Sequence, residues 1–66
     1  MLVKSQTGTI YEIWIISTEK NMVYCQAVPD KRKKYVLGQY SDMNRATQVF
    51  NEIRKYTYEY YEMSLK

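Results

Sequence analysis

The chain has 66 residues, a formal net charge of +3 and a pI near 9.0. A domain of this length buries only about 60% of the surface that its unfolded chain exposes, so its core is marginal. One cysteine and no histidine exclude an internal disulfide and a zinc site of the usual four-ligand type. Oligomerisation is the remaining common way to stabilise so small a domain, and an aromatic content of 15% favours it.

Four segments rich in β-branched and aromatic residues are predicted strands, at about residues 1–4, 9–17, 22–28 and 34–40. Polar connections separate them: a turn at Gly8, a turn over residues 18–21, and a turn that begins at Pro29. Because short connections join neighbouring strands, we expect an antiparallel meander.

Strict alternation along the second strand divides its side chains between two faces. One face would carry Tyr11, Ile13 and Ile15, and the other Ile10, Glu12, Trp14 and Ile16. A sheet with one wet face alternates apolar with polar residues, but here both faces are largely apolar. We therefore expect a helix to cover one face and a second subunit to cover the other.

The hydrophobic period then changes from two to 3.6 residues. Ser41 is the predicted N-cap, and an apolar stripe follows at Ala46, Val49, Phe50 and Ile53. No Gly or Pro ends this pattern, so the helix is predicted over about residues 42–61, with a short added strand as the alternative for residues 56–63. The predicted fold is a single α+β domain, an antiparallel β-meander of three to four strands packed on one C-terminal amphipathic α-helix.

Aromatic side chains supply the candidates for an oligomer or partner interface. Residues 54–63 hold four of the eight tyrosines, and Tyr56 and Tyr60 continue the buried stripe of the predicted helix. Tyr58 and Tyr61 lie off that stripe and are expected to point outward. The predicted interface residues are Trp14, Ile16, Tyr24, Tyr58 and Tyr61.

The densest positive charge lies in the predicted turn at residues 31–34. One interpretation is a hairpin tip that contacts phosphates. The alternative is a solvated turn whose charges protect strand edges from pairing. The candidate anion-binding or partner-binding residues are Lys31, Arg32, Lys33, Lys34, Tyr35, Arg45 and Arg54. Without histidine, a carboxylate pair or a glycine-rich phosphate loop, we expect no catalytic residues, no metal and no cofactor, and hence no enzyme.

The segment LGQYSDMNRATQVFNEI, residues 37–53, resembles small uncharacterised proteins of phages and prophages of Gram-positive bacteria. The shared pattern is Leu-Gly-x-Tyr-Ser, then a helix with Arg-Ala, a hydrophobic pair and Glu-Ile. The resemblance implies a β-meander followed by a helix, and a phage accessory protein made in the cytoplasm of the bacterial host.

Three functions follow as hypotheses, and none of them involves binding to a membrane. The first is an oligomeric host-takeover or anti-defence inhibitor, which binds a bacterial immune protein or sequesters a nucleotide immune signal. The second is a small nucleic-acid-binding module that uses the basic turn at residues 31–34. The third is a virion or assembly component.

Overall fold

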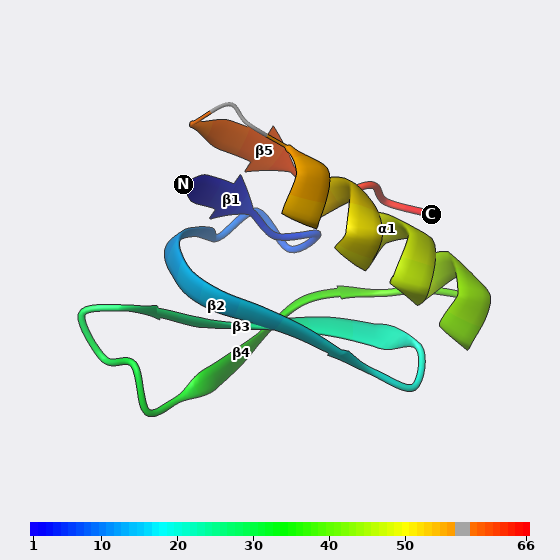
Figure 1. Cartoon of the computed structure of the whole chain (residues 1–66), viewed down its shortest axis with the longest axis horizontal. Helices are drawn as coiled ribbons and strands as arrows, with labels where there is room; N and C mark the ends of the chain where they lie inside the picture. Colours follow the sequence, from blue (N-terminus) through cyan, green and yellow to red (C-terminus); the bar gives the residue numbers. More distant parts are fainter. Residues whose placement is uncertain (57–58) are drawn as a thin grey trace.

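The computed structural model describes residues 1–56 and 59–66. Its elements in chain order are β1 (Leu2–Lys4), β2 (Ile10–Glu19), β3 (Met22–Val28), β4 (Lys34–Gln39), α1 (Met43–Lys55) and β5 (Tyr60–Glu62). The described strands form one five-stranded sheet in the order β4-β3-β2-β1-β5 (Figure 1). The predicted α+β class is confirmed. The sheet is mixed, however, because β5 runs parallel to β1 while the other neighbours are antiparallel.

The core lies between one face of the sheet and α1. The helix buries Ala46, Val49 and Ile53, which belong to the predicted apolar stripe. The sheet side of the core is formed by buried Val3, Val23, Cys25, Ala27, Leu37 and Tyr61. Full burial of each large apolar side chain contributes about 1.5–3 kcal/mol, so this single layer supplies most of the hydrophobic stabilisation. In Figure 1, α1 crosses one side of the sheet, and no other described element covers the opposite side.

A β-bulge in β2 changes which side chains reach the core. The pairing with β3 shifts register between Ile13 and Ile15. As a result Ile13 and Ile16 both pack against the core, whereas Trp14 and Ile15 are both exposed. Strict alternation placed Ile15 with Ile13 and Ile16 with Trp14, and that prediction is wrong. A bulge inserts one extra residue into one strand, so alternation reverses beyond it.

Both ends of α1 differ from the sequence prediction. Asp42, and not Ser41, is the N-cap, because its carboxylate Oδ1 accepts a hydrogen bond of 2.8 Å from the Arg45 backbone N–H. The helix ends at Lys55 instead of about residue 61. The chain then returns beside β1, where Leu2 N–H donates to the Glu59 carbonyl at 2.7 Å and Met63 N–H donates to the Lys4 carbonyl at 2.9 Å. Pairing with an open sheet edge thus prevails over moderate helix propensity.

Gln6 connects three parts of the chain that are distant in sequence. Its backbone N–H donates to the Leu37 carbonyl at 2.8 Å, and its side-chain Oε1 accepts from the Gln39 N–H at 2.7 Å. Its Nε2 donates to the Ser64 carbonyl at 2.9 Å, which also accepts from the Tyr40 hydroxyl at 2.8 Å. The loop after β1 therefore satisfies part of the outer edge of β4 and holds the C-terminal tail against it.

Gly38 has a packing role beside this network. A Cβ at this position would lie 3.0 Å from two atoms of the Tyr40 side chain and 3.1 Å from Gln6 Cδ. The Tyr40 side chain is buried and fixed by its hydrogen bond to Ser64. In this chain the Tyr40 ring therefore packs directly on the backbone of Gly38.

We predict that Gly38→Ala lowers the free energy of unfolding by about 1–3 kcal/mol, because the added methyl group overpacks against Tyr40 and Gln6. Urea unfolding followed by circular dichroism measures this change. Gln39→Ala is the matched control, since that side chain is exposed and its substitution should change stability by less than about 0.5 kcal/mol. Equal stability of the two variants would refute the proposed packing role.

Candidate functional site

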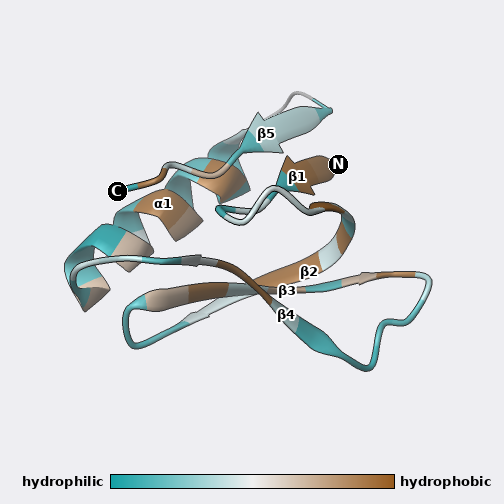
Figure 2. Ribbon diagram, turned by 180° about the vertical axis from the view of Figure 1, so that it is seen from behind, coloured by the Kyte–Doolittle hydropathy of each residue, from teal (hydrophilic) through white to brown (hydrophobic). Residues whose placement is uncertain are grey.

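The side of the sheet away from α1 carries a group of uncovered apolar and aromatic side chains. We call this surface the open face, and its apolar members are Leu2, Ile10, Trp14, Ile15, Tyr24, Val28, Val36 and Tyr60. Seven of these eight are exposed, and Tyr24 is half-buried. Figure 2 shows hydrophobic colouring along the middle of β2, whereas the β3–β4 connection is hydrophilic.

The strand register makes the open face continuous. Tyr24 lies beside Val36, Ile15 lies beside Gln26, and Leu2 lies between Glu12 and Tyr60 on the neighbouring strands. Directly opposed side chains in a sheet are within contact distance, so these rows join the apolar side chains to Gln26 and Glu12 in one surface across the five strands. A contiguous apolar patch with polar neighbours is typical of an interaction surface.

Two lysines lie over aromatic rings of the open face. Lys31 Nζ is 4.8 Å from the centre of the Trp14 ring, and Lys34 Nζ is 5.9 Å from the centre of the Tyr24 ring. Both distances fall within the range of cation–π attraction. Among the described residues, the ion pairs within 4.0 Å are Lys4–Glu62 at 3.8 Å and Arg32–Asp30 at 3.4 Å. The two lysines therefore lack a carboxylate partner in that part of the chain.

The predicted anion-binding residues do not form one cluster. Residues 31–34 lie in and just after the β3–β4 connection, whereas Arg45 is in the first turns of α1 and Arg54 in its last turn. Figures 1 and 2 both place α1 and this connection on different sides of the molecule. Arg45 donates to the Lys66 carbonyl at 2.9 Å and to Ser64 Oγ at 3.0 Å, and the Arg54 guanidinium lies 5.6 Å from the Phe50 ring.

Tyr35 also lies apart from the basic residues that flank it in sequence. Its ring stacks on Tyr11 with centroids 4.8 Å apart, and it packs against the core. Its side chain therefore points to the helix side of the sheet, away from the open face.

The predicted interface residues are divided between the two faces. Trp14 and Tyr24 lie on the open face, whereas Ile16 packs against the core. Tyr61, expected to point outward, is instead 7% exposed, and its hydroxyl donates to Glu52 Oε1 at 2.8 Å. Burial and the Glu52 carboxylate raise the pKa of the Tyr61 hydroxyl. Tyr58 lies outside the described residues.

Sequence reasoning misses several members of the open face. Strict alternation assigns Ile15 to the core, because the bulge has no signal within the apolar run Ile13–Ile16. Val36 lies between Tyr35 and Leu37, and Val28 lies between Ala27 and Pro29, so nothing in the local sequence marks either valine as a residue of the exposed face. The available signal is the excess of apolar residues on both faces of the predicted strands.

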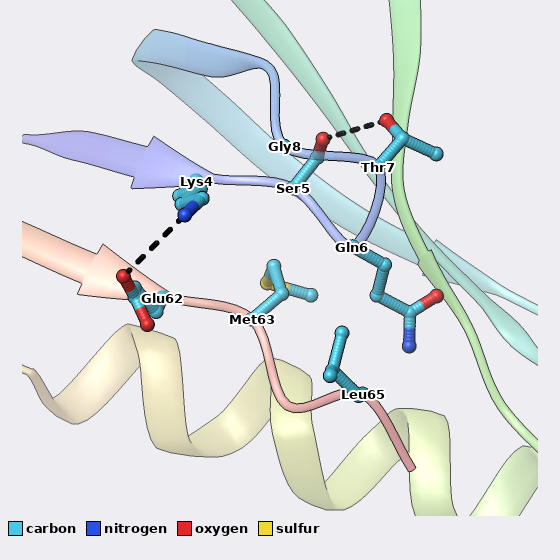
Figure 3. Close-up of a pocket in the computed structure, with 8 residues that line it drawn as sticks. All are labelled: Lys4, Ser5, Gln6, Thr7, Gly8, Glu62, Met63 and Leu65. Carbon is cyan, nitrogen blue, oxygen red and sulfur yellow. Dashed lines mark hydrogen bonds and ion pairs between the residues drawn. The ribbon is translucent and has the colours of Figure 1, made fainter.

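A cavity of about 300 Å³ lies between the loop after β1 and the C-terminal tail (Figure 3). Lys4 and Glu62 form an ion pair at its wall, and the hydroxyls of Ser5 and Thr7 hydrogen-bond to each other at 3.0 Å. The Ser5 hydroxyl also accepts from the Thr9 N–H at 3.2 Å. These polar groups satisfy one another, and the lining supplies no base that would activate Ser5 as a nucleophile.

Cys25 is fully buried beneath α1. Burial raises the pKa of its thiol to about 11, which favours the unreactive protonated form. Among the described residues, no group of three or more His, Cys, Asp or Glu side chains is placed to hold a metal ion. Within the same residues, no helix has the length and apolar character needed to span a membrane.

Comparisons with protein-family models, with curated proteins and with solved structures find no match to this chain. The open face and the adjoining lysines are therefore interpreted from their own chemistry.

We predict that Cys25 reacts with Ellman's reagent at pH 8 at least about a hundredfold more slowly in the folded protein than in denaturant. A pKa near 11 instead of 9.0 reduces the thiolate population about a hundredfold, and burial blocks access further. The absorbance of the released thionitrobenzoate measures both rates. Rapid reaction in native buffer would show that the β3 core is open to solvent.

Proposed function

We propose that the protein acts by binding another protein, without catalysing a reaction, and that the open face is its contact surface. The observation that carries this proposal is the set of exposed apolar side chains that one face of the sheet presents on all five strands, with Trp14 and Ile15 on the central strand β2. An apolar patch with charged residues at its edge has the arrangement of a protein interface, where a hydrophobic centre is surrounded by a polar rim. Trp and Tyr are also the residues that most often dominate binding energy.

The biological setting of this proposal comes from the resemblance of residues 37–53 to phage and prophage proteins. In that setting the partner is a bacterial host protein, and the protein is an accessory factor for host takeover or anti-defence. The absence of a reactive cysteine or an activated serine on the described surface supports binding as the mode of action. In the absence of the host protein, a second copy of the chain covers the same face, because a small domain gains stability by covering this patch, and the host protein then displaces that copy.

A second candidate function is binding of a nucleotide or a single-stranded nucleic acid at the β3–β4 end of the open face. It is favoured by the pairing of Lys31 with Trp14 and of Lys34 with Tyr24, because cations and stacking rings side by side are used by single-strand binders. The aliphatic residues Leu2, Ile10, Ile15, Val28 and Val36 favour a protein partner, since they offer nothing to a phosphate backbone.

We predict that Ile15→Ser together with Val36→Ser abolishes capture of the host partner by the immobilised protein from lysate of infected bacterial cells. Removing two apolar side chains of the open face should weaken binding at least about tenfold, since each tenfold corresponds to about 1.4 kcal/mol. Quantitative mass spectrometry of the captured proteins measures the effect. Asn51→Ala, on the exposed side of α1, is the matched control and should capture as the wild type does. Identical capture by both variants would refute the proposal.

For the second candidate function, Trp14 fluorescence provides the test. This function predicts that oligothymidine quenches Trp14 fluorescence and that Lys31→Ala with Lys34→Ala weakens binding. The slope of the log–log salt dependence should then fall by about 0.7 for each phosphate that the variant no longer neutralises. No quenching with oligothymidine or with a panel of linear and cyclic nucleotides at low salt would remove this candidate.

A further inference from the structure

The open face carries opposite charges that no described residue of the same chain neutralises. Lys34 lies on β4, beside Gln26 of β3, which in turn lies beside Ile15 of β2. Glu12 lies on β2 beyond the bulge, between Val28 and Leu2. Both charged residues are exposed and belong to the same face of the sheet.

Neither charge has an opposite partner within 4.0 Å among the described residues, where the ion pairs are Lys4–Glu62 and Arg32–Asp30. Lys34 instead directs its ammonium group toward the Tyr24 ring at 5.9 Å. One strand, β3, separates Lys34 on β4 from Glu12 on β2, and the register pairs Lys34 with Gln26, which pairs with Ile15 three residues along β2 from Glu12. The open face therefore carries unneutralised cations at Lys31 and Lys34, near the β3–β4 connection, and an unneutralised anion at Glu12, on the central strand between Val28 and Leu2.

This arrangement is complementary to itself. In an isologous interface with twofold symmetry, residue i of one copy meets residue j of the other, and residue j meets residue i. A second copy turned about an axis in the plane of the open face can place Lys34 opposite Glu12 twice. The same rotation brings the two apolar surfaces together, so that Ile15 and Trp14 become buried and the Lys34–Glu12 ion pairs lie beside them, because Glu12 is on the central strand β2.

From this self-complementarity, and resting on the proposed function, we infer that a second copy of this chain covers the open face in a twofold dimer in which Lys34 of each copy pairs with Glu12 of the other. An acidic protein partner would place negative charge opposite Glu12. A nucleic acid would place its phosphates against Glu12 and against aliphatic side chains that cannot bind them. Opposed like charges select against such partners, which is how charge sets specificity at an interface.

Charge reversal in separate chains tests the inference. The wild type should sediment at micromolar concentration with twice the 8.0 kDa mass of the chain. Lys34→Glu alone places Glu opposite Glu12, and Glu12→Lys alone places Lys opposite Lys34. Each single variant should raise the dimer Kd at least about tenfold. An equimolar mixture of the two variants should restore a heterodimer, because both contacts are again between opposite charges.

The mixture also controls for folding, since a variant that fails to fold cannot regain its partner. Lys55→Glu, at the exposed end of α1, should leave the dimer unchanged, and Ile15→Ser should weaken it.

A monomeric wild type, a dimer insensitive to both reversals, or a mixture that stays monomeric would each overturn the inference. If the wild type is monomeric and the Ile15→Ser, Val36→Ser protein still loses its host partner, the proposed function stands without the dimer. If neither dimer nor capture responds to changes on the open face, both proposals fail.

Discussion

The register shift in β2 is the constraint on which the rest of the molecule depends. It lets Ile13 and Ile16 face α1, although an even alternation would send them to opposite sides. It also sends two adjacent large residues, Trp14 and Ile15, to the other side. A single short helix can then complete the core, because it has only one apolar layer to cover. The cost is an apolar surface on the opposite face, which the described part of the chain leaves in contact with solvent.

At both edges of the sheet, backbone groups form hydrogen bonds with other segments of the same chain. At one edge, β5 pairs with β1 in parallel and buries Tyr61 and Met63. At the other edge, Gln6 donates to Leu37 and accepts from Gln39, so part of β4 is satisfied by the loop after β1. A three-residue edge strand at β5 and a partly satisfied edge at β4 reduce strand-to-strand aggregation, which is the common hazard of small sheets. In the proposed dimer, side chains of the open face and not backbone groups of a sheet edge make the contact.

Much of this architecture could be predicted from the sequence, and the failures have identifiable physical causes. Strand β3 begins and ends at its predicted residues, and the other three N-terminal strands lie within two residues of theirs, because β-branched runs and polar turns are local signals. The predicted end of α1 is six residues too late, since Tyr and Thr do not break a helix and the open edge of β1 is known only from the tertiary structure. The bulge in β2 has no sequence signal, because residues 13–16 are all apolar. For the site, Trp14 and Tyr24 were predicted, but the distance of Arg45 and Arg54 from the basic hairpin depends on how the helix crosses the sheet.

The central claim is that the open face is covered in solution although nothing in the described chain covers it. Methyl relaxation enhancement by a soluble paramagnetic gadolinium chelate measures this directly, residue by residue. The account predicts that the methyl groups of Ile15, Val28 and Val36 are enhanced as weakly as those of buried Val23 and Val49. Leu65, which is 75% exposed, serves as the reference for a free methyl group. Enhancement of Ile15, Val28 and Val36 as strong as that of Leu65 would contradict the account, because it would show that the open face faces water.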